Sequence, residues 1–223
     1  MKYLIALLLS ASAVLSQPMM FGTVPSLKSG MVAWWTFNEG SGTKAMDYGG
    51  LGFNGTISGS VWTNGIVGGA MYFGGSAYID ITGIVSTSTN FTFCSWVKSS
   101  TTTANSYLLD FGSGRLVIAL ISDASPQAGV YSGSWARFVQ APTNGWNHLA
   151  FVCSGTASQL YTNGVLASSA GYSGKQIGGG ARIASQYNLT TDTVTGTLDD
   201  MRIYNRALSA SEIAQLYNGG YGR

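Results

Sequence analysis

A short apolar segment near the end of the chain, over residues 194–204, contains Val194, Leu198, Met201, Ile203 and Tyr204. A short apolar segment of this kind indicates a β-strand. Side chains of a strand point alternately to its two faces, so Asp199 is expected to share a face with Met201 and Ile203, and Asp200 to lie on the other face. The pattern therefore places one carboxylate on an otherwise apolar face.

A buried carboxylate is costly unless it is paired, hydrogen-bonded or bound to a metal ion. Two partners for Asp199 stay open at this point. The first is a set of backbone N–H groups together with Arg206, and the second is a calcium ion.

Helix signals follow this strand directly. Ser209 and Glu212 have the spacing of a capping box, in which each side chain accepts a hydrogen bond from the backbone N–H of the other residue. Leu208 and Ile213 have the spacing of a hydrophobic staple, and a glycine pair after residue 218 ends the segment. The chain therefore predicts one short helix near its C-terminal end.

The preceding residues predict strands only, about a dozen of them at regular spacing. Residues 70–81 alternate as a hairpin with its turn at Gly74-Gly75, and residues 106–121 and 129–140 predict two further strand pairs. Asn163-Gly164 is the favoured pair for a type I′ hairpin turn. We therefore predict an all-β fold, a two-sheet antiparallel jelly-roll sandwich with one short C-terminal helix.

The composition fits one extracellular β-domain. A chain of 223 residues, 45% of them hydrophobic, is long enough for a single sizeable core. Only 9% of its residues are charged, against roughly 25% in an average soluble protein. The formal net charge is +2, or +1 without Lys2, and there are no runs of Lys or Arg. Binding to nucleic acid or to an acidic membrane surface is therefore not expected.

The first residues have the features of a cleaved secretory signal peptide. Lys2 precedes an apolar run over residues 3–15, and small residues occupy the −3 and −1 positions of a cleavage site after residue 16. The run is shorter than the roughly 20 apolar residues of a membrane span, which favours a secreted protein over a signal anchor. The predicted organisation is a signal peptide over residues 1–16, a linker over 17–30 and one domain over 31–223.

The closing segment 199–217, DDMRIYNRALSASEIAQLY, resembles the C-terminal signature of the laminin-G-like jelly rolls of the concanavalin A-like lectin/glucanase superfamily. The resemblance extends to the opening segment that starts at residue 31. It implies that the opening strand pairs beside the closing strand, which would bring Glu39, Asp47 and Asp199 together.

Asp47 lies in a Gly-rich loop whose carbonyl groups are free to act as ligands. Calcium takes six to eight oxygen ligands, including carbonyls and carboxylates. The resemblance therefore predicts a calcium ion held by Asp47, Asp199 and Glu39. The alternative is an Asx turn at Asp47 without a metal ion.

Cys94 and Cys153 stand in a chain that is expected to leave the cytosol, where disulfides form. In the pentraxins, which are relatives with the same sandwich, the equivalents of these two strands are joined by a disulfide, and the resemblance implies a Cys94–Cys153 bond. Alignment on His148 instead places Ala150 opposite Cys94, about 10 Å along the strand from Cys153. A bonded pair and two free thiols both stay open.

Catalysis is not expected. Retaining glycoside hydrolysis needs two carboxyl groups about 5 Å apart, but the two glutamates, Glu39 and Glu212, belong to a turn and to a helix cap. His148 is the single histidine, and Cys153 lies on the opposite face of the same predicted strand, out of reach as a thiolate partner.

Aromatic residues in segments rich in Gly, Ser and Thr are candidates for stacking on a sugar ring. Trp135 and Tyr131 are the leading pair and Trp62 is a further candidate, whereas Tyr172 and Tyr187 lie in similar surroundings. We predict a secreted, non-catalytic, lectin-like domain that binds a carbohydrate or an extracellular protein. The alternative is a structural or adhesive component of an extracellular or virion surface, assembled as a homo-oligomer.

Overall fold

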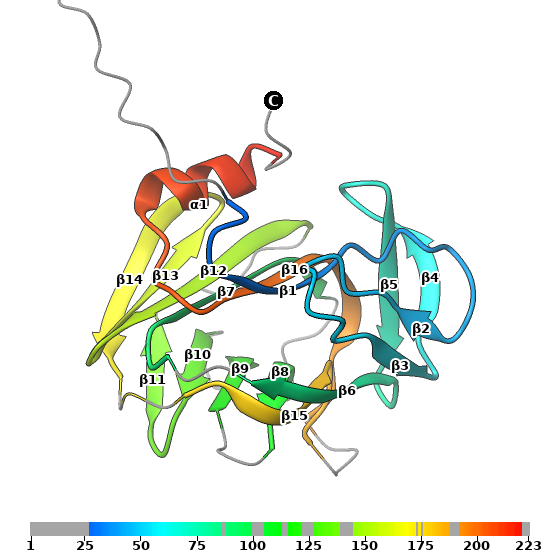
Figure 1. The fold of residues 1–223 in the computed structure, drawn as a ribbon, viewed down its shortest axis with the longest axis horizontal. Coiled ribbons are helices and arrows are strands. Elements are labelled where there is room, and N and C mark those ends of the chain that lie inside the picture. The colour runs from blue at the N-terminus through cyan, green and yellow to red at the C-terminus, as the bar shows by residue number, and fades with distance from the viewer. Residues whose placement is uncertain are drawn as a thin grey trace, which may run out of the picture.

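The computed structural model describes residues 27–85, 88–99, 105–112, 116–121, 127–138, 145–172, 174, 176–187 and 192–219. Within these residues, sixteen strands form two antiparallel sheets that lie one above the other, and one short helix lies outside them (Figure 1). The predicted two-sheet jelly-roll sandwich is confirmed. The predicted signal peptide and most of the predicted linker lie outside the described residues. The described residues contain no helix long and apolar enough to cross a membrane.

The first sheet has eight strands, and β16 is paired along both of its edges. Their order is β14 (Val165–Gly171), β13 (Ala157–Thr162), β12 (Asn147–Ser154), β7 (Phe91–Ser99), β16 (Thr195–Tyr204), β5 (Gly69–Gly74) and β4 (Val61–Asn64), with β1 (Met31–Trp35) also beside β16.

The second sheet also has eight strands. Their order is β11 (Trp135–Phe138), β10 (Gln127–Tyr131), β9 (Leu116–Ile121), β8 (Ser106–Phe111), β15 (Gly178–Ile183), β6 (Tyr78–Val85), β3 (Gly55–Ser58) and β2 (Lys44–Ala45). Apolar side chains from the facing sides of the two sheets form one main core.

The opening strand lies beside the closing strand, as the resemblance implied. Strand β16 pairs with β7 along one edge, while its other edge pairs first with β5 and then with β1. A β-bulge marks this change of neighbour, because the register with β7 shifts between Asp199 and Arg202 and Asp200 has a φ of 48°. The guanidinium of Arg202 binds the Asp200 carboxylate at 2.9 Å, and the indole N–H of Trp34 in β1 donates to the same carboxylate.

The bulge interrupts the alternation of side chains that was expected in β16, so the predicted position of Asp199 is wrong. Leu198, Met201 and Ile203 point into the main core, so the extra residue turns Asp199 away from the face of Met201 and Ile203. A bulge changes which residues share a face without leaving a clear mark in the hydrophobic pattern.

The predicted hairpin over residues 70–81 is wrong. Strands β5 and β6 belong to different sheets, and the chain crosses from one sheet to the other after Gly74. Both strands send alternate side chains into the same core, so their sequences look like two halves of one hairpin. The other predicted pairs, β8–β9, β10–β11 and β13–β14, are confirmed, and Asn163 and Gly164 have the positive φ angles of a type I′ turn.

Helix α1 (Ala210–Tyr217) covers part of the outer face of the first sheet (Figure 1). The capping box is confirmed: the Ser209 hydroxyl accepts from Glu212 N–H at 3.3 Å, and the Glu212 carboxylate accepts from Ser209 N–H at 2.9 Å. Leu208 and Ile213 are both buried beneath the helix in a second, smaller core. The helix thus covers part of this outer face, where side chains of β7, β12, β13 and β16 meet it.

His148 lies under this helix on β12. Its ring is 5.3 Å from the Trp96 ring and 6.3 Å from the Tyr217 ring, measured between centroids, and the residue is buried. Burial lowers the pKa of His148 to about 3 because the charged imidazolium would be desolvated there. His148 is therefore a neutral packing residue at physiological pH.

We expect the contribution of His148 to stability to fall as the pH is lowered from about 6.5, the pKa of an ordinary histidine, towards about 3. In this window His148 of the unfolded chain binds a proton that His148 of the folded chain does not, so this contribution falls by up to about 1.4 kcal/mol per pH unit. The variant His148→Phe keeps a flat ring but removes the titration. Urea unfolding at several pH values is expected to show the variant gaining on the wild type as the pH falls.

Asp199 changes stability with pH in the opposite direction, but it is present in both wild type and His148→Phe, so its effect cancels in the difference between them. Burial raises the pKa of Asp199 to about 6, so the contribution of Asp199 to the free energy of unfolding is lost as the pH rises towards that value. A difference between wild type and His148→Phe that stays constant with pH would contradict the burial of a neutral His148.

Candidate functional site

A single row of directly paired residues crosses the whole second sheet on its outer face. Core residues such as Leu109, Ile118 and Ile183 alternate with the row along each strand, so the row points away from the core. With about 4.8 Å between strands, the row is roughly 34 Å long. From β11 to β2 its members are Trp135, Tyr131, Val117, Asp110, Arg182, Asp80, Thr56 and Lys44.

The β11 end of the row is aromatic. The Trp135 and Tyr131 rings are 5.3 Å apart, and Tyr107 meets the Trp135 ring edge-on at 6.3 Å. The tyrosine Tyr107 is buried with apolar residues of β9, whereas Trp135 and Tyr131 are only half-buried. The indole of Trp135 is therefore held in place by packing and is still partly open to solvent.

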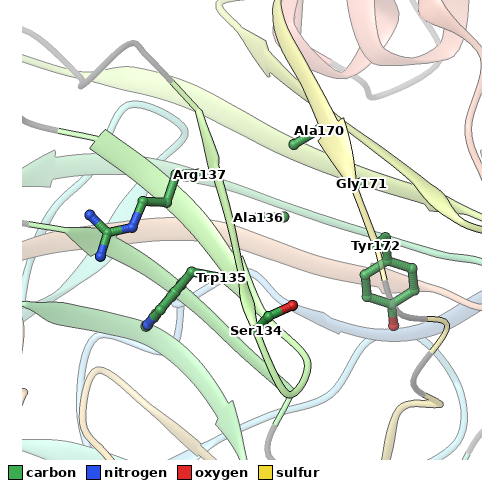
Figure 2. A pocket seen from close by; sticks show the side chains of 7 residues that line it. All are labelled: Ser134, Trp135, Ala136, Arg137, Ala170, Gly171 and Tyr172. Atoms are coloured by element: carbon green, nitrogen blue, oxygen red, sulfur yellow. The ribbon is translucent and has the colours of Figure 1, made fainter.

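A pocket of about 380 Å³ lies beside Trp135, between the edge strands β11 and β14 (Figure 2). Figure 2 shows the side chains of Trp135 and Arg137 on one side of β11 and Tyr172 across the pocket from them. A ligand in contact with the indole therefore lies over the outer face of the sheet, with the pocket at its flank. The pocket is lined by Ser134, Trp135, Ala136, Arg137, Ala170, Gly171 and Tyr172.

The far part of the row is polar and ordered by an ion pair. Arg182 binds Asp80 through two contacts, Nε to Oδ1 at 2.7 Å and a second guanidinium nitrogen to Oδ2 at 3.2 Å. Its guanidinium carbon also lies 3.8 Å from the centroid of the Tyr78 ring. The Arg182 side chain is 10% exposed and that of Asp80 is 41% exposed, so the carboxylate is held rigidly and faces solvent.

The structure brings two of the three predicted ligand-binding aromatic residues together. Trp135 and Tyr131 are cross-strand partners. Trp62 instead lies on β4, at the edge of the first sheet, where its indole N–H donates to the Gly42 carbonyl at 3.1 Å. The sequence did not reveal that Tyr107 packs against Trp135 or that Asp80 belongs to the row, because both depend on the pairing register.

Asp47 is held by its own loop. Its Oδ1 accepts from the N–H groups of Trp34 at 2.9 Å and Gly49 at 2.7 Å, and its Oδ2 accepts from Phe53 N–H at 2.9 Å. The bond from Gly49 is the Asx turn that was the alternative to a calcium ion. Three N–H donors thus occupy three of the roughly four lone-pair sites of the carboxylate.

Asp199 and Glu39 hold other loops. Oδ2 of Asp199 accepts from the N–H groups of Ile66 and Val67, both at 2.9 Å, and Oε1 of Glu39 accepts from Met46 N–H at 2.7 Å. The expected Asp199 partner Arg206 binds Glu212 at 2.6 Å instead, which corrects that part of the prediction.

The expected convergence of the three carboxylates is likewise not found. Across the described ranges, no three or more His, Cys, Asp or Glu side chains gather as they would around a metal ion. Glu39, Asp47 and Asp199 therefore do not fit a shared calcium site. Calcium binding itself stays a prediction.

The two cysteines are free and buried, so the Cys94–Cys153 disulfide implied by the resemblance is not formed. Cys94 pairs with Ala150 and Cys153 with Phe91, which places the thiols three positions apart along neighbouring strands. Cys153 faces the main core and Cys94 the smaller core under α1. Burial raises the pKa of both thiols, that of Cys94 to about 12, which keeps them protonated and unreactive.

Jelly-roll sandwiches occur in lectin domains and in viral capsid proteins, among others. The family described as the concanavalin A-like lectin/glucanases superfamily, through its Laminin_G_3 member, matches residues 73–214, and the chain belongs to this family. The resemblance seen in the sequence is thereby confirmed. A comparison with curated proteins finds no match.

Solved structures with the same fold include one sugar-bound domain. Domain 4 of AbnA, a GH43 extracellular arabinanase from Geobacillus stearothermophilus, was solved in complex with arabinotriose. It is 22% identical to this chain with a TM-score of 0.69, and the match covers 84% of this chain and 98% of that domain.

Two toxin binding domains are also similar, and this chain spans about half of each. The binding domain of Paraclostridial Mosquitocidal Protein 1 is 18% identical with a TM-score of 0.66, covering 87% of this chain and 53% of that one. The binding domain of botulinum neurotoxin DC, in complex with rat synaptotagmin II, is 15% identical with a TM-score of 0.67, covering 86% and 52%. At these identities the likeness shows the fold alone.

We expect Asp47→Ala to lower the free energy of unfolding by about 1–3 kcal/mol, because three backbone N–H groups lose their acceptor. Glu39→Gln is the control, since its amide oxygen still accepts from Met46 N–H, and a change within about 0.5 kcal/mol is expected. Thermal or urea unfolding measures both variants. Equal stability of Asp47→Ala and wild type would contradict the role of Asp47 in the loop.

The same unfolding measurements, run with calcium and with a chelator, test whether Asp47 binds a calcium ion. An ion that binds the folded chain raises the midpoint. Because backbone N–H groups surround Asp47, we expect its destabilising effect to be the same in both conditions. A larger effect in calcium than in chelator would show that Asp47 is a ligand.

Proposed function

We propose that this chain is a non-catalytic carbohydrate-binding domain whose ligand lies on the outer face of the second sheet, against Trp135 and Tyr131. The observation that carries the proposal is the half-exposed indole of Trp135, supported by two tyrosine rings and flanked by the pocket between β11 and β14. A fixed flat ring offers apolar area and a negative face to the C–H groups of a sugar, at little cost in conformational entropy.

The ligand is a neutral sugar chain. The row contains two acidic residues, Asp110 and Asp80, and two basic ones, Arg182 and Lys44, so its formal charges sum to zero. The pocket lining contains one charged residue, Arg137. The arabinotriose bound to domain 4 of the arabinanase is a neutral oligosaccharide of this kind, and it supplies the first probe.

The absence of an enzymatic role is part of the proposal. Among the described residues, the carboxylate of Asp80 is bound through both oxygens to Arg182, and Glu212 is bound to Arg206 and its helix cap. Carboxylates held in this way are poor general acids, because a neighbouring guanidinium favours their ionised form. We place the domain outside the cell, on the support of the signal-peptide pattern over residues 1–16.

A second candidate function is assembly, and strand β14 favours it. Val165 is 69% exposed and Leu166 is 47% exposed, and no charged residue lies between Val165 and Gly171 on this sheet edge. Edge strands of monomeric proteins usually carry charges that prevent pairing with other chains. The same jelly roll would then serve an adhesive or structural surface.

We expect Trp135→Ala to weaken glycan binding about 10–100-fold, because the stacking surface is lost. A glycan array identifies the ligand, with arabinotriose as a defined probe, and titration calorimetry measures the change in Kd. The matched control is Trp62→Ala, which removes a half-buried indole from the other sheet and should leave the Kd unchanged.

Two outcomes would contradict the proposal. The first is an equal loss in both variants, which would place the ligand elsewhere or reflect a damaged fold. The second is no glycan signal for the wild type together with a symmetric oligomer in light scattering, which would favour assembly.

A further inference from the structure

We infer that Tyr187 forms a second stacking subsite on the outer face of the second sheet, so that the domain binds a linear oligosaccharide of several residues. This inference rests on the proposed function and extends it, because it assigns the length of ligand that the face accommodates.

Two glycines make room for the ring of Tyr187. A Cβ atom built on Gly112 would lie 1.9 Å from Cδ1 of Tyr187, and one built on Gly180 would lie 2.2 Å from its Oη. The N–H of Gly112 donates to the Gly180 carbonyl at 3.2 Å, so the two glycines are neighbours at the β8–β15 boundary. The ring therefore lies across the backbone of two neighbouring segments, in contact with it from Cδ1 to the hydroxyl.

Neither glycine is needed for its own backbone conformation. Gly112 and Gly180 do not have a positive φ, whereas turn glycines such as Gly133 and Gly164 do. Any residue could adopt their backbone angles, so what the fold requires at both positions is the missing side chain. The ring is accommodated against the sheet by two separate residues.

The backbone of Tyr187 is fixed as well. Its N–H donates to Oδ2 of Asp110 at 2.9 Å, and Asp110 is a member of the outer row. Tyr187 belongs to none of the apolar core clusters of the described residues, and it is partly exposed. With one side of the ring against backbone, the exposed part faces outward from the same sheet face as Trp135.

The separation of the two aromatic platforms sets the ligand length. Trp135 lies on β11 and Tyr187 over the boundary between β8 and β15, which is three to four strand spacings, or roughly 17 Å. A short oligosaccharide contacts one platform only. A longer chain lying across the strands contacts both, and the second contact then forms at high effective concentration.

The test compares short and long ligands on four proteins. Trimers and octamers of linear arabino-, xylo- and gluco-oligosaccharides are titrated by calorimetry into the wild type, Tyr187→Ala, Tyr187→Phe and Trp135→Ala. For the series that binds, the wild type should bind the octamer at least about tenfold more tightly than the trimer, counted per binding site.

The variants separate the two platforms. Tyr187→Ala should bind the trimer as tightly as the wild type does but should bind the octamer no more tightly than the trimer. Tyr187→Phe should behave like the wild type with both ligands, because the ring remains. Gly180→Ala, whose new methyl group would displace the ring at Oη, should behave like Tyr187→Ala while retaining the tyrosine. Trp135→Ala should no longer bind the trimer measurably.

The possible failures are distinguishable. If the wild type binds trimer and octamer equally, or if Tyr187→Ala keeps the full gain, the second subsite is overturned while the proposed function stands. If the wild type binds no trimer and no octamer, the proposed function fails and takes the inference with it. A Tyr187→Ala variant that also loses the trimer overturns the division into two platforms, provided that its melting temperature matches the wild type.

Discussion

The fold depends on how β16 is held between its neighbours. Arg202 and Asp200 form a buried ion pair on this strand, and Trp34 of β1 joins it through its indole N–H, with the Arg202 guanidinium 4.4 Å from the Trp34 ring centroid. Removal of one partner from such a pair leaves an uncompensated buried charge, at a cost of about 3–5 kcal/mol. The bulge at Asp200 makes this contact possible, and it also sends Asp199 to the turn between β4 and β5. The bulge therefore positions both the contact of Asp200 with Arg202 and Trp34 and the contact of Asp199 with the β4–β5 turn.

The two sheets divide the tasks of the domain. Helix α1 covers part of the outer side of the first sheet, and the buried His148 and Cys94 beneath it are packing residues. The second sheet carries the outward row, in which a stacked aromatic end is followed by a neutralised ion pair. Each row member is a direct cross-strand partner of the next, so the side chains of the row lie next to one another and together form the outer surface of this sheet. The proposed carbohydrate site is a consequence of register, rather than of any loop or assembled catalytic group.

The closing strand, the capped helix and the fold class could be predicted because their signals are local, as the Ser209–Glu212 capping box shows. The sheet to which a strand belongs is not local information, which is why β5 and β6 were taken for a hairpin. The bulge at Asp200 was invisible for the same reason, so Asp199 was placed on the wrong face. Trp135 and Tyr131 could be singled out because the composition of their own segment, rich in Gly and Ser, marks them, and their pairing follows from the short turn between them. The fit of Tyr187 over Gly112 and Gly180 instead requires the pairing of strands distant in sequence.

The most direct measurement of the central claim follows the indole N–H resonances of the six tryptophans by NMR while a binding glycan is added. The resonance that disappears in Trp135→Phe identifies the indole on the outer face of the second sheet. The account predicts that this resonance shifts with the ligand concentration, while that of Trp62, assigned in the same way, stays in place. A shift at Trp62 or Trp34 with an unchanged Trp135 would place the ligand on the first sheet and contradict the account.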